Sequence, residues 1–151
     1  MKIRKADGFD AKRISYLIIK NTEKVLENNY NSEQIRVWKE CNSPKSIKEQ
    51  LLSRVIFCAY ENERLVGTIG LLKNEVVGLY VSYAKRGKGL GKTLLDHLET
   101  YAKSKNFKEL VLTSTPSAEK FYLKNGYQPI GQVVINVEGI AFKETKMIKQ
   151  L

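Results

Sequence analysis

The sequence predicts a single α/β domain of the α+β type over residues 1–151, with a mixed, mostly antiparallel central sheet of about seven strands flanked by about four helices. The chain has 151 residues, of which 42% are hydrophobic, and this suits one domain with a sizeable core. Between residues 54 and 81, strand-like runs are joined by short polar turns, which is typical of antiparallel hairpins. A strand–loop–helix–strand unit around Arg86 favours one locally parallel pair.

The amino-terminal third is predicted to hold a short strand followed by helices. The opening MKIRKA alternates in polarity, as a strand does. Apolar residues recur at helical spacing over residues 10–26. Asn31 with a glutamine three residues later matches a capping box, and Ser43-Pro44 matches an N-cap followed by proline in the first helical turn. The strand-like runs RVIFCAYE, LVGTIGLL and VVGLYV come next.

The second half is predicted to alternate between helices and strands. A long amphipathic helix begins near Leu90, and its apolar stripe continues through Leu94, Leu95, Leu98 and Tyr101. The run KELVLTS reads as a strand, and Thr115-Pro116 predicts the start of a further helix that includes AEKFYLKN. Two strands over residues 132–137 and 141–148 complete the predicted sheet.

The chain carries a formal net charge of +10, from 26 Lys and Arg against 16 Asp and Glu. A positive field attracts anions, such as nucleic acid or a polyphosphorylated cofactor, and it disfavours a polycationic substrate. Because the lysines are spread along the whole chain, a general lysine-rich composition explains the charge equally well. No aromatic-interleaved basic stretch or nucleic-acid motif is found, so the composition does not favour nucleic acid as the partner.

The cysteines, the histidine and the length of the apolar runs narrow the class of protein further. Cys41 and Cys58 do not form a disulfide framework, and with the single His97 they do not supply a zinc ligand set, so we expect no metal. Cys58 is expected to be a small core residue. No apolar run reaches the ~20 residues of a membrane span, and no apolar signal segment follows the first residues. We therefore expect a cytoplasmic protein that does not enter the membrane.

The most informative stretch is RGKGLGKT, residues 86–93, between a predicted strand and a predicted helix. The first backbone N–H groups of a helix lack intrahelical partners, and glycines let an anion approach them. With Arg86, Lys88 and Lys92, the turn predicts a phosphate or pyrophosphate site. A P-loop would require glycine in place of Arg86, and a dinucleotide fingerprint would require glycine in place of Lys92, so neither motif is complete.

The same turn matches the pattern Q/R-x-x-G-x-G/A, and AEKFYLKNGY matches A-x-x-F-Y-x-x-x-G-Y. In the order strand, turn, leucine-rich helix, strand and second motif, these residues resemble the acetyl-CoA-binding core of the GCN5-related N-acetyltransferase (GNAT) superfamily. The resemblance is strong over residues 54–127, and the predicted elements extend it over nearly the whole chain. It implies the acyl-CoA N-acyltransferase (GNAT) fold and an acetyl-CoA-dependent N-acetyltransferase, an acyltransferase of class EC 2.3.1.

The resemblance also assigns a cofactor site. It places the pyrophosphate of acetyl-CoA on the glycine turn and the pantetheine arm beside the preceding strand, which must splay from its neighbour to admit the thioester. Glycines at positions 89 and 91 would leave room for the pyrophosphate. The residues that it implies for acetyl-CoA binding are Leu79, Tyr80, Val81, Arg86, Gly87, Lys88, Gly89, Leu90, Gly91 and Lys92.

Two further residues are assigned catalytic roles by the resemblance. Glu75, six residues before Val81, would remove a proton from the acceptor amine, directly or through water; as an alternative it is only a turn residue. Tyr122 would protonate the departing thiolate, since the pKa of a phenol lies within a couple of units of that of a thiol; as an alternative it is a packing aromatic. Thr115 stands where family members often carry asparagine, which leaves that cofactor contact in doubt.

The predicted reaction is transfer of an acetyl group to a primary amine by direct attack in a ternary complex. The acceptor is a small molecule or a protein amine, and the sequence does not identify it. Tyr30 and Trp38 are candidate walls of its pocket. Two other functions stay open: a catalytically inactive protein that binds or senses acetyl-CoA, and a nucleic-acid-associated basic protein. The oligomeric state also stays open, with a homodimer as one alternative.

Overall fold

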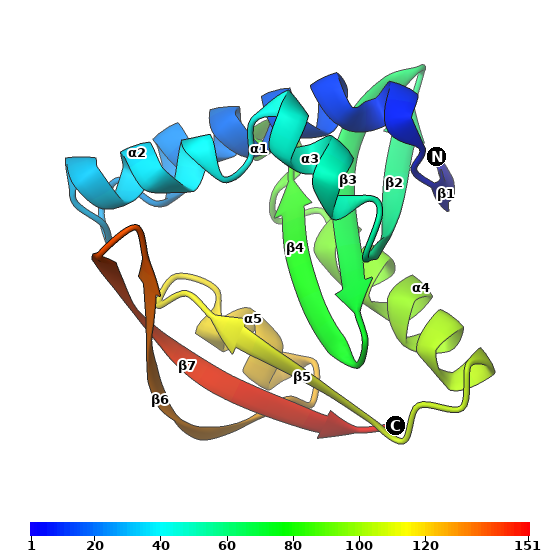
Figure 1. Ribbon diagram of the computed structural model, residues 1–151. Coiled ribbons are helices and arrows are strands. Elements are labelled where there is room, and N and C mark those ends of the chain that lie inside the picture. The colour runs from blue at the N-terminus through cyan, green and yellow to red at the C-terminus, as the bar shows by residue number, and fades with distance from the viewer.

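The computed structural model describes all 151 residues and has one seven-stranded sheet in the order β1-β2-β3-β4-β5-β7-β6. The strands are β1 (Lys2–Lys5), β2 (Val55–Glu61), β3 (Arg64–Leu72), β4 (Glu75–Val81), β5 (Glu109–Ser114), β6 (Gln128–Val137) and β7 (Ile140–Gln150). The helices are α1 (Ala11–Val25), α2 (Ser32–Glu40), α3 (Pro44–Gln50), α4 (Leu90–Ser104) and α5 (Glu119–Lys124), with short 3₁₀ turns η1 (Gly8–Asp10) and η2 (Tyr83–Lys85). Figure 1 shows α1 to α3 along one side of the sheet and α4 on the other side.

The predicted fold class is confirmed by the pairing of the strands. All neighbouring strands are antiparallel except β4 and β5, which form the single parallel pair. The structure has five α-helices rather than about four, because three separate helices lie between β1 and β2. No helix is long and apolar enough to cross a membrane.

The start of α5 is a correction to the sequence prediction. The helix begins at Glu119, not at Pro116, and residues 116–118 form a turn. The Thr115 hydroxyl lies 3.3 Å from the Ser117 hydroxyl and therefore does not cap a helix beginning at the proline. The two closing strands are also longer than predicted: β6 begins earlier, at Gln128, because its antiparallel ladder with β7 continues as far as the pair Gln128 and Ile148, and β7 runs from Ile140 to Gln150.

Local capping signals explain where the early helices begin. The Asn31 side chain accepts a hydrogen bond from the Gln34 N–H at 2.9 Å, and the Gln34 side chain accepts one from the Asn31 N–H at 2.9 Å. This confirms the predicted capping box of α2. Ser43 caps α3 by accepting from the Ser46 N–H at 3.2 Å, with Pro44 in the first turn.

Two apolar layers hold the sheet between the helices. The larger one packs the stripe of α4, including Leu94, Leu95 and Leu98, against β3, β5 and β7. The smaller one packs α1 and α3 against β2, where Cys58 is fully buried, as predicted. Both cysteines are free. Since burying a leucine side chain contributes about 1.5–3 kcal/mol, the three leucines of α4 are a main anchor of this helix.

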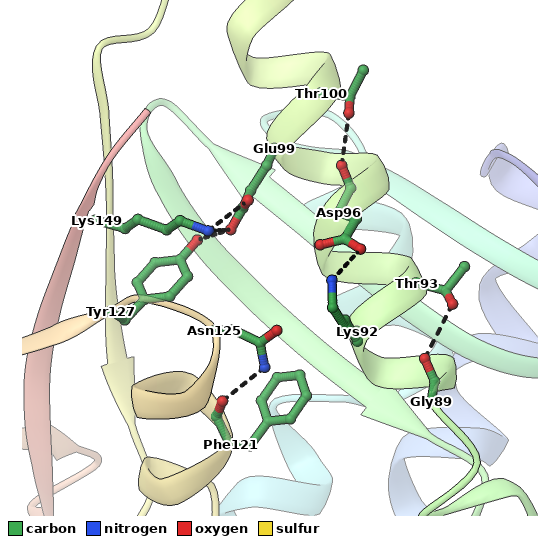
Figure 2. Close-up of polar contacts among 10 residues, drawn as sticks. All are labelled: Gly89, Lys92, Thr93, Asp96, Glu99, Thr100, Phe121, Asn125, Tyr127 and Lys149. Carbon is green, nitrogen blue, oxygen red and sulfur yellow. Dashed lines mark hydrogen bonds and ion pairs between the residues drawn. The ribbon is translucent and has the colours of Figure 1, made fainter.

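A polar network fixes α4 to the carboxyl-terminal part of the sheet. Glu99 of α4 accepts hydrogen bonds from the Lys149 ammonium group at 2.8 and 3.0 Å and from the Tyr127 hydroxyl at 3.1 Å (Figure 2). The network therefore joins α4, which carries the glycine turn at its start, to β7. Glu99 is nearly buried, so the ion pair is shielded from solvent.

The strands β4 and β5 separate almost as soon as they pair. Their only register pair is Glu75 with Val111, and a backbone hydrogen bond of 3.0 Å joins the Val111 N–H to the Asn74 carbonyl. Beyond this point β4 stays with β3 and β5 stays with β7, so the sheet opens into a V (Figure 1). Gly78, with a φ of 64°, lies where the β3–β4 register shifts.

The amino-terminal strand is tied to η1 by a buried carboxylate. Asp10 is 1% exposed and accepts two hydrogen bonds of 2.8 Å from the Arg4 guanidinium. It also accepts hydrogen bonds from the Tyr60 hydroxyl and the Asp7 N–H. Hydrogen bonding to Arg4 holds the pKa of Asp10 well below its usual range, with Tyr60 and Asp7 acting in the same direction against the effect of burial.

We predict that Asp10→Asn lowers the free energy of unfolding at pH 7 by about 2–3 kcal/mol, because three donors lose a charged acceptor. A carboxyl group with a lowered folded-state pKa stabilises the protein above its unfolded value of about 3.9, and this contribution is lost as the pH falls further. Urea unfolding should therefore show a difference between wild type and variant that shrinks from pH 7 to pH 3. The exposed Glu33→Gln should change little, and an equal loss at both pH values would contradict the assignment.

Candidate functional site

A cavity of about 660 Å³ occupies the V between β4 and β5. Its wall is formed by α1, α2, β4, the glycine turn with the start of α4, β5, the turn before α5, α5 itself, β6 and β7. These segments are far apart in the sequence and meet only because the sheet opens here. The cavity therefore connects the predicted phosphate site to the predicted catalytic residues.

The structure brings together nearly all of the predicted site residues. Glu75 and Tyr122 line the cavity, and Lys88 does not, because it is exposed outside it. The cavity-lining residues among those predicted to bind acetyl-CoA are Leu79, Tyr80, Val81, Arg86, Gly87, Gly89, Leu90, Gly91 and Lys92.

The glycine turn has the backbone expected of an anion site. Gly87 and Gly89 have φ values of 71° and 82°, in the left-handed region that favours glycine, and a Cβ added at either position would meet nothing within 4 Å. The Gly89 carbonyl accepts hydrogen bonds from the Thr93 N–H at 3.0 Å and from its hydroxyl at 3.1 Å (Figure 2). Since no side chain caps α4, its first N–H groups are left to an external acceptor.

Gly91 has a different role from the other two glycines. A Cβ at this position would lie 3.3 and 3.4 Å from ring carbons of Phe121, so the glycine allows α4 to approach α5 closely. The sequence interpretation treated Gly89 and Gly91 alike, as space for pyrophosphate. In the structure, a bulky residue at Gly91 would also displace Phe121 and disturb packing.

The positive charges around the turn are not equivalent. Lys92 pairs with Asp96 at 2.6 Å (Figure 2), and Lys85 pairs with Glu61. Arg86 lies over the Tyr83 ring, 5.9 Å from its centroid, and forms no ion pair within the protein. Arg86 is therefore the cavity-lining cation of the turn whose charge is not already balanced.

Strand β4 forms one side of the cavity with a backbone that has no partner on its β5 side after Glu75. Asn21 of α1 donates a hydrogen bond from its side chain to the Val81 carbonyl and so fixes the end of this strand. Trp38 of α2 donates from Nε1 to the Tyr80 hydroxyl at 2.9 Å. The part of β4 that is predicted to bind the pantetheine arm is thus held in place by two helices, while its unpaired edge faces the cavity.

Tyr122 of α5 is a buried aromatic with an unused hydroxyl. The residue is 8% exposed and lines the cavity, and its hydroxyl forms no hydrogen bond within the protein. Its ring packs against Phe121 and Tyr127, with centroids 5.2 and 5.7 Å away. Burial raises the pKa of Tyr122, and the nearby Tyr80 and Glu144 raise it further.

This shift changes the argument for Tyr122 as an acid. The sequence interpretation used the pKa of a free phenol, whereas the buried phenol is a weaker acid than that. A thiolate formed in the same desolvated cavity would also have its pKa raised, for the same reason. Proton transfer depends on the difference between the pKa of the phenol and the pKa of the thiol. Desolvation raises both pKa values, so it changes their difference less than it changes either value alone.

Glu144 of β7 is a cavity residue that sequence reasoning missed. It is 6% exposed and forms no ion pair within the protein. Burial raises the pKa of Glu144, the hydroxyls of Thr113 and Tyr30 oppose this, and the charge of Glu75 adds to it. The alternation of the last strand, in which Phe142 and Glu144 face the same side, is the sequence signal that could have found it.

Only one of the two aromatic residues suggested as walls of the acceptor pocket lines the cavity. Trp38 lines the cavity, whereas Tyr30 does not line it and packs behind Trp38 and Phe142, at centroid distances of 5.7 and 5.4 Å. Thr115 also lines the cavity. The His97 ring packs against Phe57, with centroids 4.6 Å apart, and is not part of the cavity.

No group of three or more His, Cys, Asp or Glu side chains is arranged to hold a metal ion. The chemistry that the cavity offers is therefore that of a polar backbone edge, an anion-binding turn, two carboxylates and a phenol. This combination suits a phosphate-bearing ligand at one end and proton transfer at the other.

Comparison with known proteins places this fold and site in one family. The acetyltransferase (GNAT) domain family matches residues 26–151. No relative is found among curated protein sequences. The chain belongs to the GNAT acetyltransferase family, as the resemblance of its motifs predicted.

Solved structures of the family share the fold over the whole chain. A GCN5-related N-acetyltransferase from Rhodopseudomonas palustris has a TM-score of 0.93 and 23% identity, covering 99% of this chain and 95% of that one. The PaiA N-acetyltransferase from Thermoplasma acidophilum, in complex with coenzyme A, has a TM-score of 0.83 and 23% identity, covering 99% and 98%. An aminoglycoside 6'-N-acetyltransferase complexed with coenzyme A has a TM-score of 0.74 and 18% identity, covering 99% and 97%.

Proposed function

We propose that this protein is an N-acetyltransferase that transfers the acetyl group of acetyl-CoA to a primary amine by direct attack in a ternary complex. The observation that carries the proposal is the single cavity that joins the glycine turn to Glu75 and Tyr122 across the V of the sheet. Family membership and the two similar proteins solved with coenzyme A support the same reading. The acceptor is a small-molecule or protein amine.

The residues present fit a phosphate-bearing co-substrate. Open space above Gly87 and Gly89, the uncapped start of α4 and the unbalanced charge of Arg86 together form an anion site. Bound acetyl-CoA would supply the activated acyl group as a thioester. The free edge of β4 at Leu79 to Val81 offers backbone groups to the rest of the molecule, as an added strand would use them.

The proton steps fall to Glu75, at the point where β4 and β5 still pair, and to Tyr122 of α5, which lines the same cavity. An alkylammonium with a pKa near 10 must lose a proton before its nitrogen can attack, and Glu75 accepts this proton directly or through water. The new C–N bond then forms, the C–S bond breaks, and the thiolate takes a proton from Tyr122. Free N–H groups of the β4 edge would stabilise the oxyanion of the tetrahedral intermediate.

Cofactor binding can be tested by calorimetry with two matched glycine variants. Gly89→Ala places a methyl group in the proposed pyrophosphate space, and we expect the affinity for acetyl-CoA to fall at least ~10-fold. Gly139→Ala is the control, because Gly139 has a φ of 78° and equally open space but lies in the β6–β7 turn. Both variants should lose similar stability from the strained φ, and only the first should lose binding.

Wild-type affinity for acetyl-CoA should also weaken as the salt concentration rises, because the anion site depends on charge. Absence of binding at millimolar acetyl-CoA would overturn the proposed function. Equal affinity in the two glycine variants would show that the pyrophosphate lies elsewhere.

The role of Tyr122 can be separated from packing by one substitution. Tyr122→Phe keeps the ring against Phe121 and Tyr127, and the lost hydroxyl has no hydrogen bond within the protein, so the melting temperature should hardly change. General acids contribute roughly 10²–10⁴-fold, and we expect a loss of kcat near the lower end because a thiolate is a fair leaving group. Affinity for acetyl-CoA should stay unchanged.

The assay for this variant is release of free CoA with an active amine found in a broad amine panel. An unchanged kcat would remove Tyr122 from the mechanism, and a fall in stability with kcat preserved would give it a structural role only. If acetyl-CoA binds but no amine in the panel releases CoA, the result would favour a binding or sensing protein over an enzyme.

A further inference from the structure

One end of the cavity carries negative charge without a protein counter-ion. Glu75 has the partly buried Arg54 in its vicinity, whose positive charge balances it in part. Glu144 has no Lys or Arg within ion-pairing distance although it is 6% exposed. A buried carboxylate normally has a cationic partner, because the cost of desolvating its charge is otherwise uncompensated.

The surroundings of Glu144 do not supply that partner. The groups that act on the pKa of its carboxyl group are the hydroxyls of Thr113 and Tyr30 and the carboxylate of Glu75, and its charge also acts on Tyr80 and Tyr122. None of these groups is a cation at neutral pH. The missing positive charge must therefore come from what enters the cavity.

The position of Glu144 is suitable for the acceptor and not for the phosphates. Its charge acts on Tyr122, the proposed donor of a proton to the thiolate, whereas Arg86 belongs to the glycine turn, the proposed phosphate site. Phe142, which lies two residues earlier on the same strand and on the same face, packs against Trp38 at 5.7 Å. The acceptor end thus combines one carboxylate with an aromatic wall.

The remaining lining of this region is largely apolar. Val25 and Leu26 from the end of α1, Trp38 from α2 and Ile135 from β6 all contribute to the cavity wall. A polyhydroxylated ligand would leave hydroxyl groups facing these side chains without partners, whereas an alkyl or aryl group would bury its surface there.

We infer that Glu144 is the binding residue for the ammonium group of the acceptor, and that the acceptor is a small primary amine with one positive charge and an apolar body. This inference rests on the proposed function, to which it adds the substrate class. An ammonium ion on Glu144 would share the cavity with the phenol of Tyr122 and with Glu75, the proposed proton acceptor. The net charge of +10 favours a singly charged acceptor over a polycation.

Trp38 provides the readout, since it is the only tryptophan of the chain and lines the cavity. Its fluorescence is titrated at pH 7 with n-hexylamine, which is then an ammonium ion, and with 1-hexanol as the neutral analogue. We expect hexylammonium to bind at least ten times more tightly than hexanol. Glu144→Gln should weaken hexylammonium binding at least tenfold and leave hexanol binding unchanged.

Two controls separate a binding role from a structural one. Glu27→Gln removes an exposed negative charge outside the cavity and should bind hexylammonium as the wild type does. Because Glu144 is a buried charge without a partner, Glu144→Gln should keep or raise the melting temperature, whereas a structural carboxylate would lower it.

The outcomes also distinguish this inference from the proposed function. Calorimetry of Glu144→Gln with acetyl-CoA should give the wild-type affinity. If acetyl-CoA binds both proteins but hexylammonium binds them equally, or binds no better than hexanol, the assignment of Glu144 is overturned alone. If the wild type binds hexylammonium through Glu144 but does not bind acetyl-CoA, the acetyltransferase function is overturned and the ammonium site remains.

Discussion

The separation of β4 from β5 is the constraint on which the site depends. Adjacent strands normally satisfy each other's backbone groups, and an unpaired buried N–H or C=O costs about 1–3 kcal/mol. Here the pairing stops after Glu75 and Val111, so the edge of β4 faces a cavity and not a strand. The sheet keeps this opening because its two halves are joined elsewhere, through α4 and its contacts with β7 and α5.

Those joining contacts are few and specific. The Glu99–Lys149–Tyr127 network fixes the middle of α4 to the carboxyl-terminal half of the sheet, as Figure 2 shows. Gly91 lets the start of the same helix approach Phe121 closely. The glycine turn and Tyr122 are therefore held on opposite sides of one narrow region, and the geometry of the cavity follows from the packing of a single helix.

The charged groups that line the cavity are of both signs. Arg86 and the uncapped start of α4 are positive in character, and Glu75 and Glu144 are acidic. This arrangement would suit a ligand pair in which one member is an anion and the other an ammonium ion. Acidic side chains in the cavity are compatible with a strongly basic protein, because net charge describes the whole chain and not one site.

The sequence by itself determined the features that depend on neighbours in the chain: the capping box at Asn31, the cap at Ser43, the hairpins and the glycine turn. These follow from hydrogen bonds and backbone preferences within a few residues. With the motif resemblance they were enough to identify the family and to name site residues that, apart from Lys88, line the cavity. Only the tertiary structure decided that Gly91 is a packing contact and that Glu144 lines the same cavity as Tyr122. Both depend on the spatial register of elements distant in the sequence, which no local pattern fixes.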